Sequence, residues 1–223
     1  ERFTGNQIAK ICQQKPEVYA ATERIALVSS FVASILVGDH VSIDASDGSG
    51  MNLMNIRTCK WDERSMKCTA PGLASKLGNI AASYKPAGSL HSYFVKRFGL
   101  SSKCMVFVFS GDNPNSLAGL RLQKPGDIAV SMGTSDTEFG FLAKPRPLAS
   151  EGHIFVNPVV PKAFMAMICY KNGSLTREYV RNKFCGKSWE SFNRAIASTK
   201  PGNNGNIGFY VREPEITPQI LNR

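Results

Sequence analysis

Two apolar runs separated by a short polar stretch most constrain what this chain can fold into. Residues 105–109 read MVFVF and residues 127–132 read DIAVSM, and continuous runs of this kind are typical of strands buried on both faces. Residues 115–122, between them, are expected to form a helix. Strand, helix and strand in this order predict an α/β or α+β architecture. The alternation continues through an apolar run, two helices and a final strand, at residues 164–170, 175–184, 188–197 and 207–211.

The N-terminal third is expected to be mainly helical. Residues 6–14 and 25–37 repeat apolar side chains at helical spacing, with Thr4 as a cap before the first and Gly38 as a stop after the second. Residues 44–50, DASDGSG, combine acids and glycines as a Ca²⁺ loop does, but the glutamate that an EF-hand needs is absent. We predict a structural turn in which Asp44 and Ser46 bond the backbone.

Asp112 is the candidate catalytic carboxylate. It follows the strand MVFVF through Ser110 and Gly111 and precedes a helix, which is where α/β proteins bind ligands. The helix dipole favours the ionised carboxylate that a general base requires. A second interpretation stays open, in which Asp112 or Asn113 only caps the helix and Pro114 takes its first position.

The sequence SMGTSD, residues 131–136, is the candidate phosphate loop. Small residues after a strand leave backbone N–H groups and hydroxyls free to approach a phosphate. The same residues could form a hairpin turn between residues 128–132 and 138–142, and the two interpretations are compatible. No Gly-Lys-Ser/Thr is present, so this is not a Walker A loop. The sequence offers no explanation for Asp136 and Glu138 beside the loop.

Residues 172–189 are rich in basic side chains and end in Trp189. A basic helix beside an indole could hold a nucleotide, with the ring packed on the base. The alternative is a solvated helix face with Trp189 in the core.

Charge and cysteine content limit the remaining classes. The net charge is +10, but residues 1–111 carry 13 basic and 8 acidic side chains and residues 112–223 carry 14 and 9, so no basic block marks a nucleic-acid binder. Six cysteines without CxxC spacing and three scattered histidines favour buried free thiols, a reducing cytoplasmic compartment and no structural metal. No apolar stretch reaches membrane-spanning length, and the N-terminus has no signal-peptide pattern.

Taken together, these segments resemble the FGGY family of carbohydrate kinases, and within it the xylulose-kinase branch. The segments that carry the resemblance follow one another along the whole chain and are ERFTGNQIAK, TERIALVSSF, IDASDGSGMNL, SGDNPNSLAG, GDIAVSMGTSDT, EGHIFVNP, KNGSLTRE, SWESF and EITP. The blocks around Asp112 and Thr134 are general to the family, whereas IDASDGSGMNL and ERFTGNQI are typical of the branch.

The resemblance implies the actin-like, RNase H-like ATPase fold, in which two α/β domains flank a cleft where sugar and ATP meet. Residues 1–124 would then be the C-terminal part of the sugar-binding domain, and residues 125–223 the N-terminal part of the nucleotide-binding domain. Family members extend further at both ends and carry there an Asp-Gly-Thr-type phosphate loop and an adenosine segment. We therefore expect this chain to be a fragment that is inactive by itself.

The resemblance also implies roles for individual residues in an ATP- and Mg²⁺-dependent phosphorylation of D-xylulose. Asp112 matches the general base, and Arg2 and Asn113 match sugar-binding positions. Gly133, Thr134 and Ser135 match the phosphate loop, and Trp189 matches a position that contacts ATP. The alternatives are a kinase of ribulose, gluconate or glycerol, a non-catalytic sugar-binding module and, least of all, a nucleic-acid binder. The oligomeric state is not implied.

Overall fold

A computed structural model gives the fold of residues 3–148 and 151–221. The chain divides into two units. The first consists of residues 1–127, 140–147 and 153–166, and the second of residues 128–139, 148–152 and 167–223.

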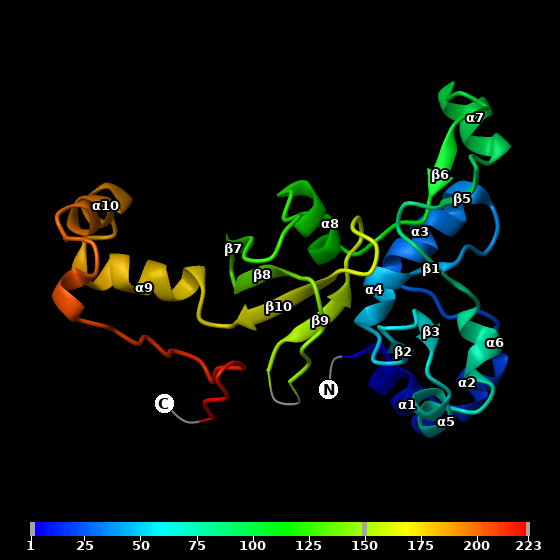
Figure 1. Cartoon of the computed structure of the whole chain (residues 1–223), viewed down its shortest axis with the longest axis horizontal. Helices are drawn as coiled ribbons and strands as arrows, with labels where there is room; N and C mark the ends of the chain where they lie inside the picture. The colour runs from blue at the N-terminus through cyan, green and yellow to red at the C-terminus, as the bar shows by residue number, and fades with distance from the viewer. Residues whose placement is uncertain (1–2, 149–150, 222–223) are drawn as a thin grey trace. The chain divides into compact units, whose positions relative to one another are not determined.

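The first unit is built from short helices and short strand pairs (Figure 1). Its elements are α1 (Thr4–Gln14), α2 (Pro16–Ala21), α3 (Val28–Val37), β1 (Ile43–Asp44), α4 (Ala45–Ser49), β2 (Met54–Asn55), β3 (Lys60–Trp61), α5 (Glu63–Thr69), α6 (Leu73–Leu77), β4 (Ile80–Ala81), β5 (Pro86–Ser89), α7 (Ser92–Phe98), β6 (Met105–Phe107), α8 (Asp112–Gly119) and β9 (His153–Val156).

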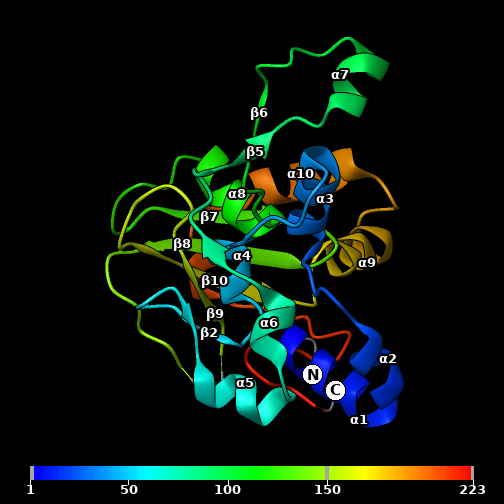
Figure 2. The same ribbon diagram turned by 90° about the vertical axis from the view of Figure 1, so that its right-hand side faces the viewer.

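Helices α1, α2, α5 and α6 lie together in this unit, as Figures 1 and 2 both show. Their apolar faces meet in one core, because the helices are too short to be stable without such packing. The Tyr19 hydroxyl donates to the carbonyl of Pro71 at 2.8 Å, which satisfies the polar end of that buried ring. The buried residues of this core are Ile8, Tyr19, Ile43, Met51, Leu53, Ala70, Leu73 and Leu77.

Two strand pairs lead to the candidate site. Strand β1 pairs in parallel with β4, with Asp44 opposite Ala81, so the chain leaves the end of β1 at Asp44. Strand β6 pairs antiparallel with β5 and leads towards the turn before α8. A second core of Ala33, Val41, Leu90 and Val106 packs α3 against this pair.

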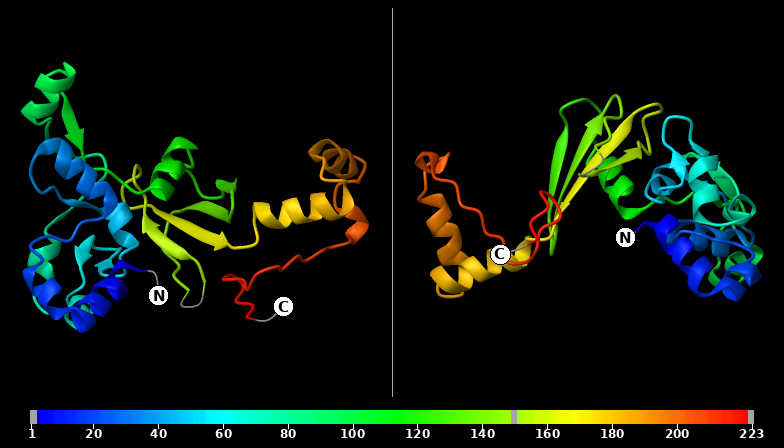
Figure 3. Two further views of the ribbon diagram at one scale, coloured as in Figure 1. Left: turned by 180° about the vertical axis from the view of Figure 1, so that it is seen from behind. Right: turned by 90° about the horizontal axis from the view of Figure 1, so that it is seen from below.

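The second unit contains β7 (Ile128–Met132), α9 (Ser174–Phe184), α10 (Trp189–Ala197) and the 3₁₀ turn η1 (Asn203–Gly205). Strands β8 (Asp136–Leu142) and β10 (Phe164–Tyr170) each contribute residues to both units. One four-stranded sheet has the order β7-β8-β10-β9. Figure 3 shows α10 following α9 at its C-terminal end.

Most of the expected elements are present, with shifted ends. Helix α8 begins at Asp112, three residues before the expected start at residue 115. Thr4 is the first helical residue of α1 and not its cap. The expected turn at residues 44–50 contains a short helix, α4. Residues 207–211 form no strand, and Phe209 is 89% exposed there.

The expectation that the strands β6 and β7 are buried on both faces is wrong for the described part of the chain. Met105 and Phe107 of β6 are 46% and 47% exposed, and Ile128, Val130 and Met132 of β7 are 66%, 56% and 66% exposed. A run of apolar residues predicts a strand, but it does not show whether other elements cover the two faces of that strand. The six cysteines are free, as predicted, but each is at least partly exposed, so the expectation of buried thiols is wrong.

Candidate active site

Asp112 is the first residue of α8, and its side chain is exposed. Its carboxylate accepts the N–H of Asn113 at 2.8 Å. The N-cap position belongs to Gly111, whose lack of a side chain leaves the cap without a side-chain hydrogen bond. The interpretation of Asp112 or Asn113 as the helix cap is therefore wrong. An exposed carboxylate at a helix N-terminus is free to meet a ligand.

Asp44, at the end of β1, is completely buried. One carboxylate oxygen accepts the hydroxyl of Ser83 at 2.6 Å, and the other accepts the hydroxyl of Ser110 at 2.5 Å. It also caps α4 by accepting the N–H of Asp47 at 2.9 Å. The prediction that Asp44 bonds the backbone is confirmed, whereas the Ser46 hydroxyl meets the hydroxyl of Ser83, at 3.4 Å. The buried Asp44 side chain also fixes Ser110, two residues before Asp112.

Asp47 lies on α4 and faces the same turn. Its carboxylate accepts the Ser29 hydroxyl at 2.5 Å. Burial raises the pKa of Asp47; the hydrogen bond from Ser29 lowers it, and the charges of Asp44 and Asp112 raise it further, with a net increase. Three carboxylates from β1, α4 and α8 thus lie near one another in the first unit.

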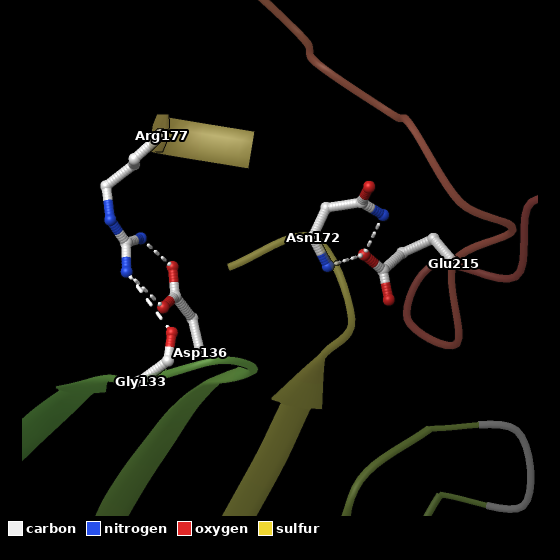
Figure 4. A network of polar contacts seen from close by, with 5 residues as sticks. All are labelled: Gly133, Asp136, Asn172, Arg177 and Glu215. Atoms are coloured by element: carbon white, nitrogen blue, oxygen red, sulfur yellow. Dashed lines mark hydrogen bonds and ion pairs between the residues drawn. The ribbon is translucent and has the colours of Figure 1, made fainter. Parts of the chain in front are cut away.

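In the second unit, residues 133–135 form the turn of the β7–β8 hairpin, as the hairpin interpretation predicted. The guanidinium of Arg177 on α9 binds both carboxylate oxygens of Asp136, at 2.6 and 3.0 Å, and donates to the carbonyl of Gly133 at 3.4 Å (Figure 4). Both side chains are about a quarter exposed, at 25% and 21%. Asp136, which the sequence left unexplained, therefore fixes Arg177 against the loop.

The N-terminus of α9 contacts the same loop. The N–H of Ser174 donates to the carbonyl of Gly133 at 2.9 Å. A Cβ on Gly173 would lie 2.5 Å from the carbonyl oxygen of Thr134, so only glycine fits at this approach. Small residues, a helix N-terminus and a guanidinium gathered at one turn are the groups that bind phosphate.

Trp189 is the first residue of α10 and is 44% exposed, so its placement in the core is wrong. The guanidinium of Arg181 lies 4.4 Å from the centre of its ring, and Phe192 meets the ring edge-on at 5.4 Å. The phosphate-loop contact is at the N-terminal end of α9, whereas Trp189 follows its C-terminal end. Eleven helical residues span roughly 16 Å, so Trp189 is not brought to the loop.

The structure thus groups Asp112 with Asn113, and Gly133 with Thr134 and Ser135. Arg2 lies outside the described residues. Sequence reasoning missed the contributions of Asp44, Asp47, Asp136 and Arg177. The cluster of acids in DASDGSG was the only available signal for the first two.

Residues 3–148 and 151–221 contain no group of three or more His, Cys, Asp or Glu side chains that could hold a metal ion. Within the same residues, no helix is both long and apolar enough to cross a membrane.

The chain is similar to known proteins along its whole length. The chain is 54% identical to the xylulose kinase of Mus musculus over 223 residues, which are 100% of this chain and 40% of that protein. It is 52% identical to xylulose kinase 2 of Arabidopsis thaliana, over 99% of this chain and 39% of the relative. The chain therefore spans about 40% of the length of the curated relatives that it matches.

A solved structure identifies the fold. The ligand-bound xylulose kinase from Lactobacillus acidophilus superposes with a TM-score of 0.79 at 17% sequence identity, over 91% of this chain and 41% of that one. The α/β chain is thus part of the actin-like ATPase fold of the sugar kinases, as the resemblance implied. The sequence family described as "FGGY family of carbohydrate kinases, N-terminal domain" matches residues 1–119. The chain belongs to the FGGY family of carbohydrate kinases.

Proposed function

We propose that the protein carrying this chain phosphorylates D-xylulose to D-xylulose 5-phosphate with ATP. The observation that carries the proposal is Asp112, an exposed carboxylate at the start of α8. The turn before it is held by the hydrogen bond from Ser110 to the buried carboxylate of Asp44. The high identity to proteins named xylulose kinase supports the choice of sugar.

In this reaction Asp112 accepts the proton of the sugar hydroxyl. The hydroxyl oxygen then forms a bond to the γ-phosphorus of ATP while the bond to the β,γ-bridging oxygen breaks and ADP leaves. Such a transfer needs mainly positioning and charge stabilisation from the protein. Asn113 and Arg2 are proposed to hydrogen-bond the sugar.

The nucleotide is assigned to the second unit. Gly133, Thr134 and Ser135 are proposed to contact its phosphates, supported by Arg177 and the start of α9 beside the loop. Trp189 is proposed to contact the adenosine part. Mg²⁺ would neutralise phosphate charge, and it usually takes its ligands largely from phosphates and water.

The domain assignment follows the same division. Residues 1–124 are proposed to belong to the sugar-binding domain and residues 125–223 to the nucleotide-binding domain. We further propose a cytoplasmic enzyme without nucleic-acid or membrane partners. The dispersed charge supports the first exclusion.

The test is ADP release with D-xylulose by the full-length protein and its Asp112→Asn variant. We expect turnover in the parent and a loss on the order of 10³-fold in the variant, because the general base is removed. Turnover that survives the substitution would assign the base elsewhere. Turnover only with ribulose, gluconate or glycerol would change the substrate, and binding of sugar without any turnover would indicate a binding module.

A further inference from the structure

Gly111 and Asp47 are in close approach, and this contact explains why residue 111 is a glycine. A Cβ on Gly111 would lie 2.7 Å from Oδ1 of Asp47, which is closer than a real methyl group approaches an oxygen. The backbone of Gly111, with φ −69° and ψ 164°, is one that any residue adopts. The carboxylate of Asp47, and not the backbone conformation, therefore requires glycine there.

Asp47 is itself held in place from two sides. The Ser29 hydroxyl on α3 donates to Oδ2 at 2.5 Å, which leaves Oδ1 facing Gly111. The backbone N–H of Asp47 donates to Asp44, whose carboxylate also binds the Ser110 hydroxyl. The two residues that precede Asp112 thus rest on two fixed carboxylates.

An acid at this position is unfavourable for folding alone. The charged form of Asp47 is disfavoured by burial and by the charges of Asp44 and Asp112, and the Ser29 bond offsets only part of this. An asparagine could accept the same Ser29 hydrogen bond without a charge. The charge of Asp47 therefore gives the fold no stability, and what the side chain offers the turn is its shape, which asparagine shares.

We propose that Asp47 is a positioning residue for Asp112, acting through the backbone of Gly111. It sets how far the 110–111 turn can approach α4 and so where the Asp112 carboxylate stands relative to the sugar hydroxyl. The inference rests on the proposed function, in which Asp112 is the base.

The test is steady-state kinetics of the full-length protein with D-xylulose and ATP. Asp47→Ala should lower kcat on the order of 10²-fold, the effect of a base displaced by about an ångström, with KM for the sugar little changed. Asp47→Asn keeps the shape and the Ser29 bond and should recover most of the lost kcat. A merely structural effect would not separate kcat from KM in this way.

Glycine variants examine the contact itself. Gly111→Ala should lower kcat like Asp47→Ala, because its methyl group meets the carboxylate. The double variant Asp47→Ala/Gly111→Ala should be faster than Gly111→Ala alone, because the methyl group then has space. Gly119→Ala is the matched control on α8, since a Cβ there would meet nothing within 4 Å, and it should leave kcat unchanged.

Thermal unfolding of Asp47→Asn gives a readout that does not depend on activity. The pKa of Asp47 is raised in the folded state, so its charged form destabilises the fold at pH values above its titration range. Burial and the charges of Asp44 and Asp112 are what disfavour the charged form. The variant should therefore melt at a higher temperature than the parent at about pH 7, and the difference should disappear at about pH 3, where the acid is protonated in both states.

The outcomes separate the inference from the function on which it rests. A parent without turnover on any polyol would reject the proposed function. A parent that turns over and loses activity in Asp112→Asn, but keeps full kcat in Asp47→Ala, would overturn the role of Asp47 alone. Equal kcat in Gly111→Ala and in the double variant would likewise contradict the proposed contact.

Discussion

Glu215 is a buried carboxylate, 8% exposed, that collects several N–H donors of the second unit. It accepts the backbone N–H of Lys171 at 2.7 Å and both the backbone and the side-chain amide of Asn172, at 3.1 and 2.7 Å (Figure 4). Burial raises the pKa of Glu215, but the hydrogen bonds, first those from the Asn172 side chain, together lower it below its usual range. The bonds therefore tie the end of the chain to the segment before α9.

This lowered pKa makes a pH-dependent contribution to stability. The contribution is present above the ordinary glutamate range, about 4.3, and is lost as the pH falls through the lower folded-state pKa. We expect Glu215→Gln to reduce the free energy of unfolding by about 1–3 kcal/mol at neutral pH, because the amide cannot accept all of these bonds. The difference should shrink as both proteins are acidified.

Urea titrations at about pH 7 and about pH 3 measure this, with Glu178→Gln as the matched control. Glu178 lies on α9, and its side chain makes no hydrogen bond or ion pair within the described part of the chain. A Glu215→Gln variant as stable as the control at neutral pH would show that the network contributes nothing.

At the scale of elements, the start of α9 is set by Gly173. A methyl group there would lie within 3 Å of the carbonyl oxygens of both Thr134 and Gly133, which are backbone atoms of the hairpin loop. We expect Gly173→Ala to displace the loop from the helix and to raise KM for ATP on the order of 10-fold, with KM for the sugar unchanged.

Initial-rate measurements with each substrate varied in turn, on the full-length protein, test this. Gly140→Ala on β8 is the control, since a Cβ there would meet nothing within 4 Å. A Gly173→Ala variant with the KM for ATP of the parent would mean that the loop does not bind the nucleotide.

The elements that the sequence missed have short-range causes. Helix α4 has only five residues, too few to show a helical repeat, and it begins because Asp44 caps the N–H of Asp47. Helix α8 begins before the expected residue 115 because Pro114 does not exclude a helix there. Pro114 is the third residue of the helix, where its missing N–H has no helical partner to lose.

At the scale of the whole molecule, the two ligands should protect different units from hydrogen exchange. The sugar-binding candidates Asp112 and Asn113 belong to the first unit, and the loop Gly133–Thr134–Ser135 and Trp189 belong to the second. In the full-length protein, D-xylulose alone should protect residues 44–50 and 110–116, and MgATP alone should protect residues 131–137 and 173–189. Sugar-induced protection confined to the second unit would contradict the assignment.

How far the sequence predicts the molecule depends on the distance between the residues concerned. Strand and helix alternation is local, so a mixed α and β class and most elements follow from the pattern, and the resemblance supplies the α/β fold. The polar network is not local. Ser29 meets Asp47 across 18 residues, and Ser110 meets Asp44 across 66. No spacing rule connects such pairs, so the contacts that hold the turn before Asp112 could be found only from the structure.

Strand β7 has a consequence for handling the chain by itself. It is an edge strand of its sheet, its side chains Ile128, Val130 and Met132 are exposed, and it contains neither a charge nor a proline. Charged side chains and prolines are what natural edge strands use to avoid pairing with further strands. Wherever β7 is uncovered, as on a ribosome or in a concentrated preparation, it can pair with a strand of a second copy, so we expect aggregation of this chain to begin at β7.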